Sequence, residues 1–98
     1  MRLVIRDDAL AEVRAAALRY ADQSPALALQ FIDAVKDALQ RVRASPMAWR
    51  IIDEDVRRCL TRGFPYGVFY TVERDFISIL AIAHCSREPG YWRARRTP

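Results

Sequence analysis

The chain has 98 residues, of which 52% are hydrophobic, and its formal net charge at pH 7 is +4. This length allows one domain with a single sheet and one or two helices, and the hydrophobic content excludes an intrinsically disordered chain. Fifteen of the sixteen basic residues are arginine, the exception being Lys36. Arginine suits the recognition of phosphate or carboxylate, although a codon usage that favours arginine explains the same composition.

The first predicted element is a short strand at residues 2–6, with Leu3 and Ile5 on one face. We expect this strand to lie beside the last strand of the sheet. Asp7 and Asp8 are predicted to cap the helix that follows and to interact with the positive end of its dipole. The apolar positions of that helix predict one buried face. They are Leu10, Val13, Ala17, Leu18 and Ala21.

A second helix is predicted to begin at Ser24 and Pro25, a favourable N-cap and a favourable first helical residue. It runs to about Ala44, where Ser45 and Pro46 end it. Its predicted inner face consists of Phe31, Val35, Ala38, Leu39 and Val42. Two helices joined this closely form an antiparallel hairpin, which we expect to lie across the sheet.

Residues 47–55 are interpreted as a linker, and three successive strands are predicted within residues 57–84. The middle strand alternates, with Tyr66, Val68, Tyr70 and Val72 on one face. Residues 76–84 are apolar on both faces, which predicts an interior strand. Its two faces are predicted to be Ile77, Ile79, Ala81 and Ala83 against Phe76, Leu80 and Ile82. Residues 73–75 form a tight hairpin.

The element order β-α-α-β-β-β predicts an α+β fold, in which a helical hairpin packs on a small, mainly antiparallel sheet. We expect residues 1–98 to form a single domain with a basic, aromatic C-terminal tail at residues 85–98. The sequence has no apolar stretch suited to a signal peptide or a membrane span. Cys59 and Cys85 lack the spacing of a zinc site or a disulfide framework. Both are predicted to be reduced thiols in a cytoplasmic protein without metal or cofactor, and a disulfide between them is the alternative.

His84 is the only histidine and ends the last predicted strand. At this place an imidazole can act as an acid or a base near neutral pH. The alternative is a structural role, in which the ring is hydrogen-bonded to a backbone carbonyl. For a lone histidine at a strand end, the structural role is the more common one.

Arginines cluster near His84 in the predicted sheet. If Arg87 and one of Arg57, Arg58 or Arg62 converge, they could hold a scissile phosphate, with Glu54 and His84 as an acid–base pair. Alternation along the strand allows only one of Arg57 and Arg58 to face such a site. The alternative is that arginines on an outer strand protect an exposed sheet edge from aggregation.

The tail combines three excess positive charges with the pair Tyr91-Trp92. These aromatic rings could stack on nucleic-acid bases while Arg93 and its neighbours hold phosphates. They could equally form a protein-binding hot spot, because Tyr, Trp and Arg dominate such sites. The structural alternative is that Trp92 folds back over the end of the sheet.

Together with the element order, several short motifs resemble the RelE/ParE superfamily of toxins from type II toxin–antitoxin modules, also called plasmid stabilisation proteins. The motifs are Phe64-Pro65-Tyr66, Phe69-Tyr70-Thr71-Val72, Ile79-Leu80-Ala81-Ile82-Ala83-His84, Arg87-Glu88-Pro89 and Tyr91-Trp92. The resemblance covers essentially the whole chain.

The resemblance implies one of two mechanisms. RelE-like members are ribosome-dependent endoribonucleases that cut mRNA, whereas ParE-like members are not nucleases and poison DNA gyrase. If this chain is a nuclease, the candidate catalytic residues are His84, Arg87, Arg58 and Glu54. Only Arg87 matches a nuclease position, because Tyr66-Gly67-Val68 lacks the expected arginine, Lys36 is not in the sheet, and Tyr91 is only near the expected tyrosine. The ParE branch, and therefore a non-enzymatic gyrase inhibitor, is favoured. A degenerate toxin that only binds its antitoxin is a third hypothesis.

Both mechanisms imply a cognate antitoxin, a small neighbouring protein whose acidic C-terminal segment wraps the toxin and gives a hetero-oligomer. The antitoxin would also supply DNA-binding autorepression. The residues expected to contact the antitoxin are Leu18, Phe31, Val35 and Tyr70. The residues expected to contact the target, gyrase or ribosome, are Arg87, Tyr91, Trp92 and Arg93.

Overall fold

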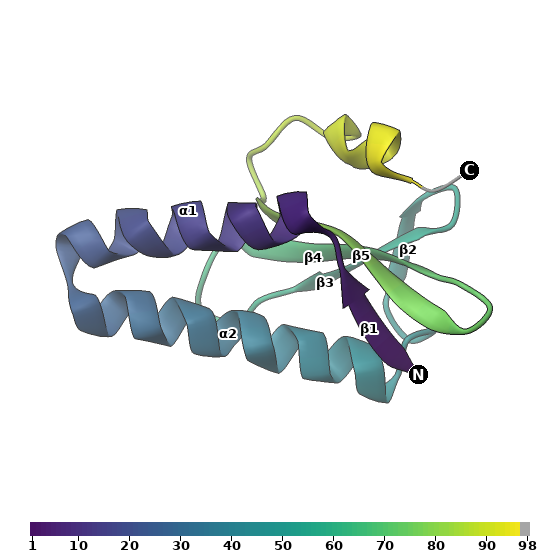
Figure 1. The fold of residues 1–98 in the computed structure, drawn as a ribbon, viewed down its shortest axis with the longest axis horizontal. Coiled ribbons are helices and arrows are strands. Elements are labelled where there is room, and N and C mark those ends of the chain that lie inside the picture. Colours follow the sequence, from purple (N-terminus) through teal and green to yellow (C-terminus); the bar gives the residue numbers. More distant parts are fainter. Residues whose placement is uncertain (97–98) are drawn as a thin grey trace.

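The computed structural model of the protein describes residues 1–96. Its elements are β1 (Arg2–Ile5), α1 (Asp7–Gln23), α2 (Pro25–Ala44), β2 (Arg50–Asp53), β3 (Val56–Leu60), β4 (Tyr66–Val72), β5 (Phe76–His84) and the 3₁₀ helix η1 (Tyr91–Arg95). The strands form one sheet in the order β1-β5-β4-β3-β2. The α1–α2 hairpin forms a layer on one face of this sheet, and η1 lies on the other side of the sheet from α2 (Figure 1).

The predicted α+β architecture is confirmed, including the position of the N-terminal strand. β1 pairs in parallel with β5, so that Leu3 lies opposite Ile77, and the other strand pairs are antiparallel. The interpretation of residues 47–55 as a linker is wrong, because Arg50–Asp53 forms the edge strand β2. A register shift between Ile51 and Asp53 interrupts its pairing with β3. An irregular strand of this kind does not show the regular alternation of polar and apolar residues, so the sequence pattern did not predict it.

The two faces of β5 differ from the prediction beyond Ile79. Phe69 pairs with Ala81 and Tyr70 pairs with Ile79, so Leu80 is an extra residue in a β-bulge. A bulge reverses the facing of every residue that follows it. Ile82 therefore packs in the core under the helices. Ala81 and Ala83 belong instead to the cluster on the opposite face.

The two helices begin differently. Ser24 caps α2 as predicted, because its side-chain oxygen accepts a hydrogen bond from the backbone N–H of Leu27. In α1 the N-cap residue is Arg6, without a side-chain cap, so the predicted capping by Asp7 and Asp8 is wrong. These acidic residues occupy the first turn, where they interact favourably with the helix dipole. Asp8 accepts a hydrogen bond from Arg6, which lowers the pKa of its carboxyl group.

The buried face of α1 is centred on Ala9 and Ala16, both fully buried. Leu18 was expected on this face, but its side chain is 69% exposed. Ala21 is exposed too. Leu18 lies two residues after buried Ala16, which places it on the other side of the helix, whereas Tyr20 in the same turn packs against the core.

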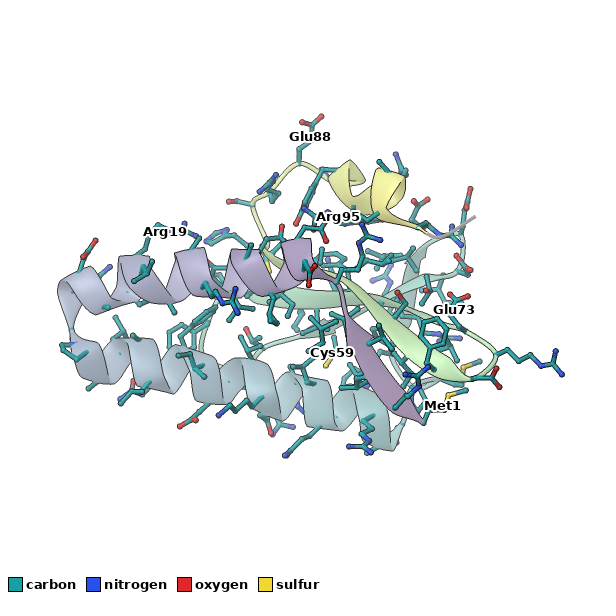
Figure 2. The ribbon with its side chains drawn as sticks, in the orientation of Figure 1. Met1, Arg19, Cys59, Glu73, Glu88 and Arg95 are labelled. Atoms are coloured by element: carbon teal, nitrogen blue, oxygen red, sulfur yellow. The ribbon has the colours of Figure 1, made fainter. Side chains whose placement is uncertain are left out.

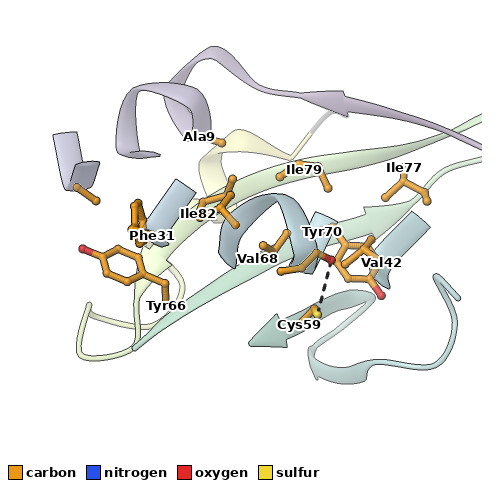
Figure 3. Packing of buried hydrophobic residues seen from close by; sticks show 13 residues of the cluster. Ala9, Phe31, Val42, Cys59, Tyr66, Val68, Tyr70, Ile77, Ile79 and Ile82 are labelled. Carbon is orange, nitrogen blue, oxygen red and sulfur yellow. Dashed lines mark hydrogen bonds between the residues drawn. The ribbon is translucent and has the colours of Figure 1, made fainter. Parts of the chain in front are cut away.

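The main core lies between the hairpin and the sheet (Figure 3). Phe31 of α2 packs edge-on against Tyr66 of β4, with 4.8 Å between ring centroids. The hydroxyl of buried Tyr70 donates to the Pro46 carbonyl at 2.6 Å, and burial raises its pKa to about 12. Burial also raises the pKa of the Cys59 thiol, which donates to the Ala38 carbonyl at 3.9 Å.

The four residues expected to bind the antitoxin differ in exposure, and their role stays a prediction. Phe31 and Tyr70 are fully buried, so a partner cannot reach their side chains without opening the core. Val35 is 4% exposed and lines an apolar groove together with Leu10. Leu18 is the most exposed of the four, at 69%.

Candidate target-binding cleft at the end of the sheet

The chain after β5 turns back over the sheet and docks there through Trp92. Gly90 adopts a positive φ of 87° immediately before η1, a conformation that glycine accepts without strain. The indole of Trp92 is 2% exposed and stacks on Phe69 of β4, with 5.7 Å between ring centroids. The indole of Trp92 therefore covers the sheet, as in the structural alternative, and the expected contact of this residue with a target stays a prediction.

Glu12 of α1 connects the tail to β5. Its carboxylate accepts hydrogen bonds from the Tyr91 hydroxyl, from Arg95 Nη1 at 2.9 Å and from the backbone N–H of Ile82 at 3.1 Å. Arg95 also donates to the Leu80 carbonyl at 3.1 Å. Since β1 pairs with β5 only as far as Ile79, these side chains satisfy backbone groups that a strand would otherwise pair. We call Glu12, Tyr91 and Arg95 the latch.

The latch shifts the ionisation of its members. Burial, then the hydrogen bond to Glu12, strongly raises the pKa of the Tyr91 hydroxyl, which is therefore a neutral donor. For Arg95, burial acts to lower the pKa, but the hydrogen bond and charge of Glu12 and the charge of Asp8 outweigh it and raise the pKa. A tyrosine whose hydroxyl is hydrogen-bonded to a partly buried carboxylate is poorly placed for acid–base catalysis.

Arg93 and Arg96 form ion pairs with the last residue of β2 and with the turn that follows it. Arg93 Nε lies 2.8 Å from Asp53, and Arg96 Nη1 lies 2.8 Å from Glu54. Arg96 also pairs with Asp55. Glu54 therefore engages the tail and is not among the residues that line the cleft with His84. The structure does not place Glu54 in the lining of the cleft beside His84, and the predicted acid–base pairing of the two stays a prediction.

Between the tail and the sheet lies a cleft of about 220 Å³. Its lining includes Arg58 from β3, Phe69 from β4, His84 at the end of β5 and Arg87 from the tail. A second recess of about 200 Å³ lies on the other side of His84 and Arg87. That recess is also lined by Arg19 of α1, a residue that sequence analysis did not single out.

Arg58 reaches the cleft because of its strand position. It pairs with Phe69 across the sheet, and its side-chain stem crosses Gly67, where an added Cβ would come within 3.2 Å of Arg58 Cγ. Arg57 points to the opposite face and donates to the carbonyls of Met47 and Trp49. Arg62 is exposed in the loop after β3, 4.0 Å from Asp37. The prediction that alternation separates Arg57 from Arg58 is confirmed.

His84 is exposed, and a hydrogen bond fixes the orientation of its ring. The backbone N–H of Ser86 donates to Nδ1 at 3.0 Å, and the Ser86 hydroxyl lies 2.7 Å from the same atom. An atom that accepts from a backbone N–H carries no proton, so the proton of the neutral ring is on Nε2. The predicted structural bond to a backbone carbonyl is therefore replaced by a bond from a backbone N–H.

Sequence analysis also missed Glu12, although its position carried a signal. Glu12 follows the buried Ala9 by three residues and precedes the buried Ala16 by four, a spacing that places all three on one helix face. A carboxylate on the buried face of a helix requires polar partners. Those partners lie 70 to 83 residues further along the chain, so only the fold identifies them.

Three further observations concern residues 1–96, the part of the chain that the structure describes. No helix there is long and apolar enough to cross a membrane. The same residues contain no group of three His, Cys, Asp or Glu side chains arranged to hold a metal ion. Cys59 is buried and Cys85 is exposed, and both are free thiols, as predicted.

Residues 3–89 match the model of the family described as the ParE toxin of the type II toxin–antitoxin system parDE. The chain therefore belongs to the ParE toxin family.

Comparison with solved structures supports the fold. A structure described as the chromosomal ParDE TA system from P. aeruginosa superposes with a TM-score of 0.76. The two chains are 23% identical, and the match covers 86% of this chain and 95% of the other. A search of curated proteins gives no significant match.

Proposed function

We propose that this protein is a type II toxin that inhibits DNA gyrase and is neutralised by a cognate antitoxin. The observation that carries the proposal is the ParE family match over residues 3–89. Gyrase inhibition is the activity that the ParE branch implies. Such a target places the site of action in the cytoplasm.

The contacts of the cleft support gyrase inhibition over RNA cleavage. Acid–base catalysis needs a group that can exchange a proton at the reacting atoms. Glu54 is held by Arg96, and the Tyr91 hydroxyl donates to Glu12. Of the four nuclease candidates, His84, Arg58 and Arg87 remain. The two arginines bind anions but do not exchange protons, so the set is better suited to binding than to acid–base catalysis.

The alternative function is a ribosome-dependent endoribonuclease. One observation favours it, because Arg58, His84 and Arg87 line the same cleft. In that case His84 Nε2 would exchange the proton, and the two guanidinium groups would stabilise charge on the scissile phosphate.

An apolar groove between the helices supports the antitoxin as a partner. The groove has a volume of about 280 Å³. Its apolar lining includes Ile5, Leu10, Val13, Ala17, Ile32 and Leu39. Two cations, Arg14 and Lys36, also line it. An amphipathic segment with acidic flanks would complement this groove, giving a hetero-oligomer in which disorder of the free antitoxin offsets part of the binding energy.

A supercoiling assay with purified gyrase tests the target. With antitoxin-free, folded protein, we expect inhibition of supercoiling or trapping of cleaved DNA. A parallel translation assay with ribosomes and mRNA serves as the counter-test. Inhibited supercoiling with intact mRNA supports the proposal, whereas cleaved mRNA with normal supercoiling overturns it in favour of the nuclease.

The His84→Gln variant separates the two mechanisms further. His84 is exposed at the end of β5, so its replacement should leave the fold intact. A gyrase inhibitor should retain most of its toxicity, because a neutral glutamine can still donate a hydrogen bond. A nuclease should lose about 100-fold or more in rate, the contribution typical of a general acid or base.

A further inference from the structure

The arginines that line the two recesses or belong to the tail fall into two sets. Arg93, Arg95 and Arg96 each form an ion pair with an acidic residue. Arg19, Arg58 and Arg87 have no carboxylate within 4.0 Å among the residues that the structure describes. The first set fastens the tail, and we call the second set the open arginines.

The open arginines line two recesses that share His84 and Arg87. Arg58 and Arg87 line the cleft together with His84. Arg19 and Arg87 line the adjoining recess, again with His84. Arg19 donates to the Tyr66 hydroxyl at 3.2 Å, and Arg87 lies over the ring of Tyr91, 3.9 Å from its centroid. These contacts orient the two guanidinium groups without neutralising their charge.

Acidic residues at the recesses do not cancel this charge. Asp53 is paired with Arg93, and the oxygens of Glu12 accept hydrogen bonds within the latch. Glu88 lines the cleft, but it is exposed, forms no ion pair among the described residues and extends away from the sheet (Figure 2). The two adjoining recesses therefore carry three guanidinium groups that no carboxylate pairs with, a favourable arrangement for anionic oxygen atoms.

The aromatic side chains at this end favour a duplex over a single strand. Tyr66, Phe69 and Trp92 are at most 9% exposed, and the guanidinium groups of Arg87 and Arg95 lie over the ring of Tyr91. Binding of single-stranded nucleic acid relies on bases stacked on accessible rings. Contacts to a duplex backbone require only cations and hydrogen-bond donors.

We propose that Arg19, Arg58 and Arg87 bind the phosphodiester backbone of duplex DNA. The site is defined by the open arginines and goes beyond the proposed inhibition of gyrase.

The test is fluorescence anisotropy of a short labelled DNA duplex, without gyrase, over a range of salt concentrations. Each phosphate contact contributes about −0.9 to the slope of log K against log salt. The combined change Arg19→Gln, Arg58→Gln and Arg87→Gln should reduce the slope by about 2 to 3, and affinity at low salt by at least about 10-fold.

A charge-matched control uses three exposed arginines outside both recesses. The change Arg2→Gln, Arg43→Gln and Arg74→Gln removes the same charge and should alter the slope by less than about 1. Equal losses for the two triple variants would overturn the site, because net charge would then explain binding. Tighter binding of a single-stranded RNA than of the duplex would overturn it as well.

Two safeguards keep the test decisive. Circular dichroism verifies folding, and if the triple variant does not fold, Arg58→Gln and Arg87→Gln should each reduce the slope by about 1. The assay contains no gyrase, so its failure is separable from failure of the proposed function. Inhibited supercoiling without duplex binding rejects the DNA site alone, whereas duplex binding without inhibition rejects the gyrase target alone.

Discussion

The two faces of the sheet are covered in different ways. On the helix face, α1 and α2 bury a continuous apolar core that includes Phe31, Tyr70 and Ile77, each fully buried. On the tail face, a smaller cluster around Phe69 and Trp92 lies beneath a single short 3₁₀ helix. That helix is held by the latch and by ion pairs.

Because of this difference, we expect the helix face to determine the stability of the protein and the tail face to determine the shape of the cleft. Burial of apolar surface is largely insensitive to salt and to moderate pH, so the helix face should determine the global free energy of unfolding. Ion pairs respond to both conditions, and a segment held by few apolar contacts can open by itself. The cleft is walled by that segment, so its shape should depend on charges that the fold does not need.

The largest effect is expected from the helix face. Phe31→Ala should lower the free energy of unfolding by about 3–5 kcal/mol, because it leaves a cavity where four aromatic rings meet. Chemical denaturation measures the loss. Leu29→Ala, on the same helix but 65% exposed, should change stability by less than about 0.5 kcal/mol. Equal effects of the two substitutions would contradict the assignment of the core.

Alkaline pH should weaken the same face. The pKa of Tyr70 is raised to about 12 in the folded protein, so its stabilising contribution is complete below pH 10 and is lost as pH rises through 12. The contribution is roughly 3 kcal/mol for a shift of about two units. Tyrosinate absorbance and denaturation as functions of pH measure it. Cys59 and Tyr91 shift in the same direction, so Tyr70→Phe should remove only part of the alkaline loss.

An intermediate effect is expected at the latch. Glu12→Gln removes the charge that pairs with Arg95, whose side chain is 17% exposed, and should destabilise the docked tail by about 2 kcal/mol. Trypsin should then cleave after Arg93 and Arg95 faster, by roughly 10-fold or more if the tail opens locally. Glu88→Gln, on the exposed part of the tail, provides the control. Unchanged cleavage in Glu12→Gln would show that Trp92 and the ion pairs of Arg93 and Arg96 hold η1 without the latch.

The sequence predicted the helix face better than the tail face, for a physical reason. Helix periodicity and the Ser24–Pro25 start are local signals, and they identified α2 and its inner residues. The pairing of β1 with β5 followed because a strand apolar on both faces needs two neighbours. The family motifs added the toxin class.

The failures concern features that depend on distant contacts. The bulge at Leu80 reverses the facing of Ala81, Ile82 and Ala83. Because the strand is apolar on both faces, no change in its polar pattern indicates the bulge. Trp92 carried the composition of a binding site, and its burial depends on the space above Phe69. The carboxylates that pair with the tail arginines lie 40 or more residues away in the sequence. Composition therefore could not show that Arg93 forms an ion pair whereas Arg58 does not.

The smallest effect should come from the exposed ion pairs of the tail, which the comparison of the two faces requires to be weak. Arg93 and Asp53 have side chains that are 64% and 28% exposed. Asp53→Asn should therefore change the free energy of unfolding by less than about 1 kcal/mol, and less still at high salt, where exposed charges are screened.

The same change frees Arg93 beside the cleft. If the cleft binds phosphate, Asp53→Asn should tighten duplex DNA binding and make its salt dependence steeper by up to about 1. Unchanged or weaker DNA binding, measured by anisotropy with the fold intact, would show that charge at the cleft does not control the interaction.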